Sequence, residues 1–271
     1  MKIVFIGGGN MATAMLGGLL QQGYAADGLY VVEPDAGKRA DLQVRLGIQP
    51  LALEAALPPD ADVVVLAVKP QQLAEVARAR ADELRGKLVI SIAAGIRMAD
   101  LDRWLAGAAR LVRVMPNTPA LVQAGISGAW LGPQATSADR ELADRILRSV
   151  GQVVWVAEEA QIDAVTAISG SGPAYVFYFI ESLTRAAEQQ GFDTATARQL
   201  AYATFDGAVK LALASSEDAA VLRERVTSKG GTTAAALNKM AEIGVQAAIV
   251  AATEAARARA AELADELGRA G

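Results

Sequence analysis

The chain has 271 residues, of which 52% are hydrophobic, 21% charged and only 5% aromatic, and it carries a formal net charge of −4. This length predicts roughly two domains, and the acidic balance argues against a nucleic-acid partner, because phosphate binding needs a positive surface. The chain contains no Cys and no His, which removes most zinc sites. A magnesium ion bound by carboxylates is the alternative, but no Asp cluster indicates one, so we expect no metal site. The chemistry must therefore use a cofactor, backbone dipoles, hydroxyls, Lys or carboxylates.

In the first part of the chain, short runs of Val, Ile and Leu alternate with helical patterns. The runs predict strands at 2–6, 29–33, 62–68, 87–92, 110–115 and 152–156. Helices are expected between them, at 10–22, from about Asp35, after Pro70, at 98–105 and at 138–149. A further strand is expected near 125–131, at the edge of the sheet. Continuous apolar strands that alternate with helices indicate a parallel sheet covered on both faces.

Beyond about residue 158 the strand patterns stop, and the remaining sequence has helical patterns. Helices are expected at 159–168, 173–190, 194–214, 217–226, 233–242 and 245–268. Residues 175–180 (YVFYFI) are apolar in succession, so every face of that helix is apolar and should be buried. In so small a helical domain, a partner subunit is the natural cover, and one large core within the chain is the alternative. We therefore expect a homo-oligomer.

The sequence also bears on location. No apolar run reaches the length of a membrane-spanning helix, about 18 residues or more. The N-terminus, MKIVFIGGG, lacks the longer apolar stretch and the cleavage site of a signal peptide. A cytoplasmic location is therefore expected, with no membrane partner.

The first predicted strand ends in a glycine-rich turn, Gly7-Gly8-Gly9-Asn10-Met11-Ala12, which matches the G-x-G-x-x-A dinucleotide fingerprint between a strand and a helix. Gly7 allows the tight turn, Gly9 lets a pyrophosphate approach the backbone, and Ala12 keeps the helix close to the strand. Amide groups at the start of the helix then face the negative pyrophosphate. The plainer alternative is a glycine turn that binds nothing. The position after a strand favours the dinucleotide site.

Glu33 ends the second predicted strand, where an acidic residue commonly accepts a hydrogen bond from the ribose 2′-hydroxyl of NAD and repels the 2′-phosphate of NADP. Lys38 and Arg39 lie close by in sequence and could instead attract that phosphate. Glu33 could equally be a simple acid before a helix. The choice between NADH and NADPH stays open, and Glu33 alone favours NADH.

Two further strand ends point to the same edge of the sheet, because ligands of open parallel sheets lie outside the carboxyl ends of the strands. Val68-Lys69-Pro70 ends one strand, and Ala93-Ala94-Gly95 follows another. The small residues would let a flat ring pack closely. Lys69 could bind a carboxylate or the cofactor, or could be a solvated strand end.

Two motifs in the second half of the chain precede helices. The segment 227–233 (TSKGGTT) offers free amides and a hydroxyl cap at a helix start, which suits a small carboxylate; an ordinary capped helix is the alternative. The segment 169–175 (SGSGPAY) is a glycine-serine turn with Pro in the first helical turn. Alone, it would be only a helix start.

Taken together, these stretches resemble pyrroline-5-carboxylate reductase. The matching pieces, in the family's order along nearly the whole chain, are IGGGNMA (6–12), AVKP (67–70), SIAAG (91–95), RVMPNTPA (113–120), AISGSGPAYVF (167–177) and SKGGTTAAAL (228–237). The resemblance implies hydride transfer from NADPH or NADH to the ring C=N of 1-pyrroline-5-carboxylate, which gives L-proline in the last step of proline biosynthesis.

The resemblance also implies the fold class. It is α/β, with an N-terminal Rossmann-type, doubly wound parallel sheet followed by an all-α dimerisation domain. We place the dinucleotide-binding domain at 1–157 and the helical dimerisation and substrate-binding domain at 158–271. The partners expected are the small cyclic imino acid and further copies of the chain, as a homodimer or a higher homo-oligomer built from dimers.

Residue roles follow from the same resemblance. The cofactor residues are the glycine-rich turn, the ends of the first strands and the loop after the fourth: Ile6, Gly7, Gly8, Gly9, Asn10, Met11, Glu33, Ala67, Val68, Lys69, Pro70, Ile92, Ala93 and Ala94. The substrate residues are Ser228, Gly230, Gly231, Thr232 and Thr233 for the carboxylate and ring nitrogen, with Asn117 and Ser171 lining the pocket. Family members often have Pro where this chain has Lys229, which adds a positive charge near the carboxylate site.

The implied chemistry suits a chain without His, because the cofactor supplies the hydride and the protein supplies position and electrostatics. A cyclic imine that binds already protonated needs no strong side-chain acid. If the neutral imine binds, a hydroxyl such as that of Thr233 could relay a proton from water. Thr233 is therefore the candidate catalytic residue.

Two other functions fit parts of the sequence. A dehydrogenase for 3-hydroxy acids, of the hydroxyisobutyrate type, shares the G-x-G-x-x-A start and a helical second domain, and it depends on a Lys in a helix of that domain. The candidates here are Lys210, Lys229 and Lys239, of which only Lys210 lies within a long predicted helix. A sensor that binds NAD(P) without turnover would not need a second small-molecule site at 227–233.

Overall fold

The computed structural model describes residues 1–270, which form two compact units. Unit 1 comprises Met1–Ser171 and the C-terminal segment from Ala256 onward, and unit 2 comprises Gly172–Ala255. The last helix, α11 (Val245–Ala270), therefore contributes residues to both units. The units are defined by compactness alone, so the functional boundary expected between residues 157 and 158 stays a prediction.

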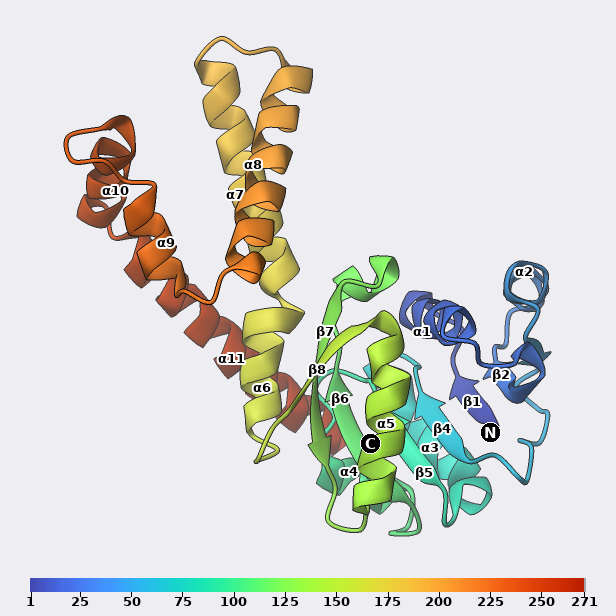
Figure 1. Ribbon diagram of the computed structural model, residues 1–271. Coiled ribbons are helices and arrows are strands. Elements are labelled where there is room, and N and C mark those ends of the chain that lie inside the picture. The colour runs from blue at the N-terminus through green and yellow to red at the C-terminus, as the bar shows by residue number, and fades with distance from the viewer. Residues whose placement is uncertain (271) are drawn as a thin grey trace. The chain divides into compact units, whose positions relative to one another are not determined.

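Unit 1 contains an eight-stranded sheet with the order β3-β2-β1-β4-β5-β6-β7-β8 (Figure 1). Neighbouring strands run parallel except β6 and β7, which are antiparallel. The order reverses between β1 and β4, which is where open sheets of this kind bind ligands. The strands are β1 (Ile3–Ile6), β2 (Leu29–Val32), β3 (Gln49–Leu51), β4 (Val63–Leu66), β5 (Leu88–Ser91), β6 (Arg110–Met115), β7 (Gly125–Leu131) and β8 (Gly151–Trp155).

Two strand expectations need correction. β7 lies between β6 and β8, so it is not an edge strand; the edges of the sheet are β3 and β8. β3 was not expected at all, because it has three residues and is too short to give a periodic signal. It also contains Pro50, which lacks a backbone N–H and is tolerated only on edge strands and at strand ends or bulges.

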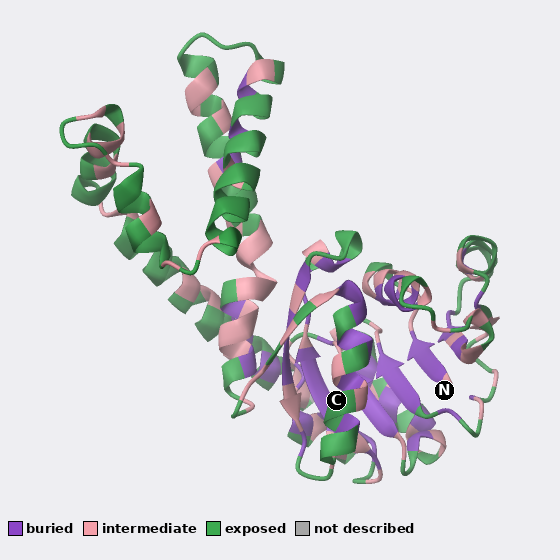
Figure 2. Ribbon diagram, viewed as in Figure 1, coloured by how far each residue is buried: buried purple, intermediate pink, exposed green. Residues whose placement is uncertain are grey.

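Helices cover both faces of this sheet. Ile3 and Phe5 of β1 belong to a core with helices α1 and α5, whereas Val4 and Ile6 belong to a second core with α3 and α4. Because both faces are covered, the central strands are buried throughout (Figure 2), which explains their continuous apolar sequences. The helices of unit 1 are α1 (Asn10–Gln21), α2 (Ala36–Leu46), α3 (Pro70–Leu84), α4 (Met98–Trp104), α5 (Ser137–Leu147) and α6 (Gln161–Val165).

Unit 2 is helical, as expected, and much of its apolar surface is open in a single chain. Phe177 and Tyr178 are 63% and 68% exposed, while Ile180 of the same helix is buried. Every helix of residues 1–270 is too short or too polar to cross a membrane. The helices that lie within unit 2 are α7 (Gly172–Gln189), α8 (Thr194–Ala214), α9 (Ala219–Arg225) and α10 (Thr232–Glu242).

Candidate cofactor and substrate sites

Gly7 makes the turn that follows β1. Its φ is +104°, and a Cβ atom there would lie 2.7 Å from the carbonyl oxygen of Ala67. The Gly7 N–H donates to the Val32 carbonyl at 2.8 Å, and the Ala67 N–H donates to the Ile6 carbonyl at 2.8 Å. The ends of β1, β2 and β4 are thereby drawn together, and only glycine fits at position 7.

Gly9 stands at the start of α1, and the space in front of it is open. A Cβ atom on Gly9 would meet no heavy atom within 4 Å, and no side chain of residues 1–270 caps this end of the helix. Backbone amides that point into open space at a helix N-terminus form an anion site. The turn therefore fits the pyrophosphate of a dinucleotide cofactor, as the fingerprint predicts.

A cavity of about 440 Å³ opens at this turn. It brings together eight of the expected cofactor residues: Ile6, Gly7, Gly8, Gly9, Glu33, Ala67, Val68 and Lys69. Sequence reasoning missed six further lining residues: Val32, Pro34, Leu53, Gln72, Glu75 and Val76. The helical spacing of Lys69, Gln72 and Val76, which lie three and four positions apart at the start of α3, is the signal that could have found that wall.

The other expected cofactor residues do not line this cavity. Asn10 lines a neighbouring groove of about 440 Å³, which shares Gly8 and Lys38 with the cavity. Met11 packs against the core, and Pro70 is the first residue of α3. The remaining three lie in the loop after β5, where Ile92 is half-buried, Ala93 buried and Ala94 exposed.

Glu33 is buried, and its carboxylate is already bound to the backbone. One oxygen accepts from the Gly8 N–H and the other from the Asp35 N–H, both at 3.1 Å. Arg39 donates to the carbonyls of Glu33 and Pro34, both at 2.7 Å, so its guanidinium braces the end of β2. Of the two expected cations, Lys38 lines the cofactor cavity and Arg39 does not.

Asn117 also has a role in holding the backbone. Its side-chain NH₂ donates to the Ser169 carbonyl at 3.1 Å, and its side-chain oxygen accepts from the Ile126 N–H at 2.9 Å. The expected glycine-serine turn at 169–175 begins within a π-helical turn, Thr166–Gly170, which is closed by the Ser171 N–H on the Thr166 carbonyl at 2.8 Å. Helix α7 then begins at Gly172, so Pro173 lies in its first turn, as expected. Such turns are frequent at functional sites. A substrate contact of Asn117 or Ser171 stays a prediction.

The expected anion loop lies in unit 2. Gly230 has a φ of +75°, and Gly231 is the N-cap residue of α10, where no side chain of the described residues caps the helix. The expected hydroxyl cap is therefore wrong. A Cβ atom on Gly231 would collide with the Ser228 hydroxyl. Thr233 is half-buried, whereas Ser228, Lys229, Gly230 and Thr232 are exposed. The open amides suit a carboxylate, and the substrate role of this loop stays a prediction.

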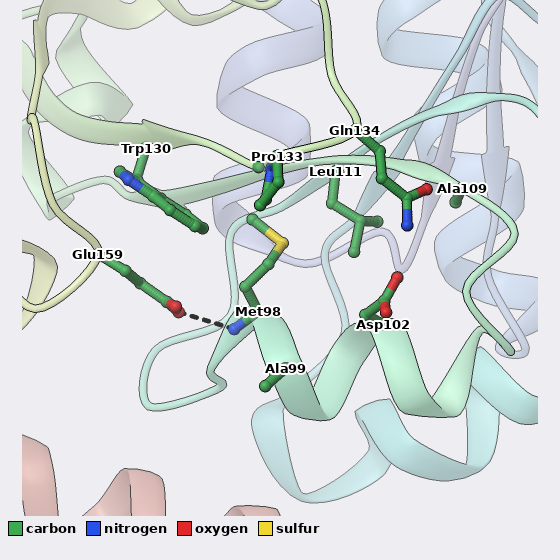
Figure 3. A pocket seen from close by; sticks show the side chains of 10 residues that line it. Met98, Ala99, Asp102, Ala109, Leu111, Trp130, Pro133, Gln134 and Glu159 are labelled. Atoms are coloured by element: carbon green, nitrogen blue, oxygen red, sulfur yellow. Dashed lines mark hydrogen bonds between the residues drawn. The ribbon is translucent and has the colours of Figure 1, made fainter.

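A second cavity in unit 1 shares no residue with the cofactor cavity. Its volume is about 260 Å³, and Met98, Leu111, Trp130 and Pro133 form its apolar walls. Figure 3 shows the Glu159 carboxylate at its rim, where it accepts from the Met98 N–H at 2.7 Å. Glu159 also pairs with the buried Arg113 at 2.8 Å. We assign this cavity no part in cofactor binding.

Comparison with known proteins agrees with these features. Residues 2–95 match a family model described as NADP oxidoreductase, coenzyme F420-dependent, and residues 159–263 match one described as pyrroline-5-carboxylate reductase dimerisation. A pyrroline-5-carboxylate reductase of Pseudomonas aeruginosa is 45% identical over 269 residues, which cover 99% of this chain and 98% of that protein.

Solved structures extend the likeness to the whole fold. A pyrroline-5-carboxylate reductase from Coxiella burnetii has a TM-score of 0.92 and 39% identity. A pyrroline carboxylate reductase from Plasmodium falciparum with NADP bound has a TM-score of 0.86 and 28% identity. Each comparison covers 97% of this chain and 98% of the other. The chain therefore belongs to the pyrroline-5-carboxylate reductase family.

Proposed function

We propose that this chain reduces 1-pyrroline-5-carboxylate to L-proline with NADPH or NADH, as the last step of proline biosynthesis. The observation that carries the proposal is the 45% identity with a reductase of that name over 99% of the chain. The open glycine-rich turn and its cavity of about 440 Å³ give the cofactor a place at the reversal of the sheet order.

In the proposed reaction, the bound cofactor supplies a hydride to the ring carbon of the C=N bond, and the ring nitrogen keeps or gains one proton. The backbone at Gly7 and Gly9 and the side chain of Lys69 hold the dinucleotide. The amides of the 228–233 loop hold the substrate carboxylate. An imine that arrives protonated needs only to be positioned, whereas a neutral imine takes its proton through the Thr233 hydroxyl from water.

The test is oxidation of NADPH and of NADH by the purified protein with 1-pyrroline-5-carboxylate, followed by the absorbance of the reduced nicotinamide, with proline identified as the product. Turnover with formation of proline is the expected result. Folded protein that binds a cofactor but makes no proline with either one would contradict the proposal.

Removing the Thr233 hydroxyl should slow the reaction without unfolding the protein. Thr233→Val is expected to lower kcat/KM about 100-fold if the hydroxyl relays a proton. Thr233→Ser keeps the hydroxyl and serves as the matched control, which should retain most of the activity. Steady-state kinetics and thermal melting measure both effects. Wild-type kinetics in Thr233→Val would remove this residue from the mechanism.

Lys38 is proposed to favour NADPH, because it lines the cofactor cavity and a 2′-phosphate is an anion. Lys38→Gln should raise KM for NADPH about fivefold, as for an exposed charge pair, and leave KM for NADH nearly unchanged. Arg45 provides the control, since it lines only the neighbouring groove and pairs with Asp41 at 2.9 Å. An equal change for both cofactors would refute this assignment.

The hydroxy-acid alternative gains no support from two of its three candidate lysines. Lys210 is exposed and pairs with Asp206 one turn before it at 2.7 Å. Lys239 pairs with Glu242 at 2.8 Å. Both arrangements are typical of a solvated helix face.

We also propose that the chain works as a homodimer or a higher homo-oligomer built from dimers. The match of residues 159–263 to a dimerisation model and the open apolar face of α7 support this assembly. They also support a functional division near residue 157, with dinucleotide binding before it and dimerisation and substrate binding after it. The proposed location is cytoplasmic, as expected for a biosynthetic enzyme of this class.

A further inference from the structure

The loop that follows β5, residues 92–97, carries three of the expected cofactor residues and packs against the C-terminal end of α11. Gly95 has a φ of +70°. A Cβ atom there would lie 3.2 Å from the Leu267 Cδ1 atom and 3.7 Å from the Leu263 Cβ atom. Ala93 and Ala264 are both buried. The backbone of the loop thus lies directly on the last turns of α11, within unit 1.

Polar contacts fix the same helix end to Arg97, the last residue of the loop, and to α4. Arg97 Nη1 donates to Asp265 Oδ1 at 2.5 Å, and Arg103 Nη2 donates to the Gly268 carbonyl at 3.0 Å. A Cβ atom on Gly268 would collide with the carboxylate of Asp100. The helix end therefore sits against the start of α4, and no side chain fits at position 268.

The two ends of the loop are held by other elements. At its start, the Ile92 N–H donates to the Leu66 carbonyl of β4 at 3.2 Å. At its exit, the Met98 N–H donates to the Glu159 carboxylate at 2.7 Å. Gly95 and Arg97, between these points, meet the end of α11. The second half of the loop, residues 95–97, therefore packs against a distant part of the chain, since Arg97 and Asp265 lie 168 residues apart in sequence.

We propose that Leu263, Ala264, Asp265, Leu267 and Gly268 of α11 are positioning residues, which hold the 92–97 loop in the shape that receives the cofactor. This inference rests on the proposed function, because it takes Ile92, Ala93 and Ala94 as cofactor residues. A ring that must meet its substrate at bonding distance is sensitive to small displacements of the surface it rests on. Loosening the helix end should therefore weaken cofactor binding before it affects the fold.

Two variants test this role in the full-length protein. Leu267→Ala removes the contact with Gly95, and Asp265→Arg sets two positive charges against each other. We expect each to raise the Kd and KM for the preferred nicotinamide cofactor about fivefold, with KM for 1-pyrroline-5-carboxylate and the melting temperature nearly unchanged. The double variant Arg97→Asp with Asp265→Arg restores the pair with reversed polarity, and should recover most of the affinity.

Arg259→Ala is the matched control on the same helix. Arg259 pairs with Glu262 and Glu266 at 2.9 and 2.8 Å on an exposed face and should leave cofactor affinity unchanged. Equal weakening in Arg259→Ala, or wild-type cofactor affinity in folded Leu267→Ala and Asp265→Arg, would overturn the inference. If Leu267→Ala does not fold, Asp265→Arg alone tests the inference, because it changes the half-exposed ion pair with Arg97. A wild-type protein that binds neither cofactor would instead count against the proposed function.

Discussion

Replacing Gly9 by Ala should strongly weaken cofactor binding and leave the fold intact, whereas replacing Gly7 by Ala should destabilise the protein itself. A Cβ atom on Gly9 meets nothing of the protein within 4 Å, so it costs the fold little but stands where the pyrophosphate must approach. We expect cofactor affinity to fall by about two orders of magnitude. Fluorescence titration with NADPH and NADH measures this loss.

Gly7 differs because its φ of +104° and its closeness to Ala67 leave no room for a side chain. A Cβ atom there should lower the free energy of unfolding by about 3 kcal/mol, the usual cost of a strongly disfavoured backbone conformation. Chemical denaturation measures this change.

Gly17, inside α1, is the control for both variants. It occupies a helical position, and a Cβ atom there would meet no heavy atom of the described chain within 4 Å. Gly17→Ala should raise the free energy of unfolding by up to about 1 kcal/mol, because Ala favours a helix over Gly. Its cofactor affinity should stay at the wild-type level. Wild-type affinity in Gly9→Ala would show that the pyrophosphate does not approach this turn.

The sequence predicts the frame of the fold because the strongest signals are local. The buried strands β4 and β5 are continuous apolar runs, and the turn after β1 needs glycine for steric reasons that act within a few residues. Strand β3 was not predicted, because three residues are too few to show a periodic pattern. The position of β7 within the sheet was predicted wrongly, because the sequence of a strand does not indicate which strands lie beside it. Only the tertiary pairing decides that.

The candidate site could also be predicted in part, again because the strongest sequence signals are local. Gly7, Gly9 and Lys69 belong to motifs, so their shared cavity could be expected. The hydrogen bonds of Glu33 and Asn117 could not be predicted. A motif indicates which residue type stands at a position, but not whether backbone groups already bind its polar atoms. The contact of Leu267 with Gly95 joins distant segments, and periodicity carries no information about it.

Replacing Phe177 by Arg should dissociate the assembly and stop turnover. Phe177 is 63% exposed on α7 in a single chain, beside Tyr178, and aromatic side chains of this kind dominate interface energies. An Arg buried between two chains at this position would have to lose its hydration, which costs several kcal/mol for each ion. Light scattering coupled to size exclusion should show the mass falling to that of one chain. The assay should show loss of proline formation.

Val44→Arg is the matched control for this effect. Val44 is an apolar residue of α2 that is 86% exposed in unit 1, outside the segment that matches the dimerisation model. It introduces the same charge and should keep both the mass and the activity of the wild type. If Phe177→Arg also kept the wild-type mass, the open face of α7 would not be the surface through which the chains associate. Loss of mass in both variants would mean that added charge, rather than the position on α7, disrupts the assembly.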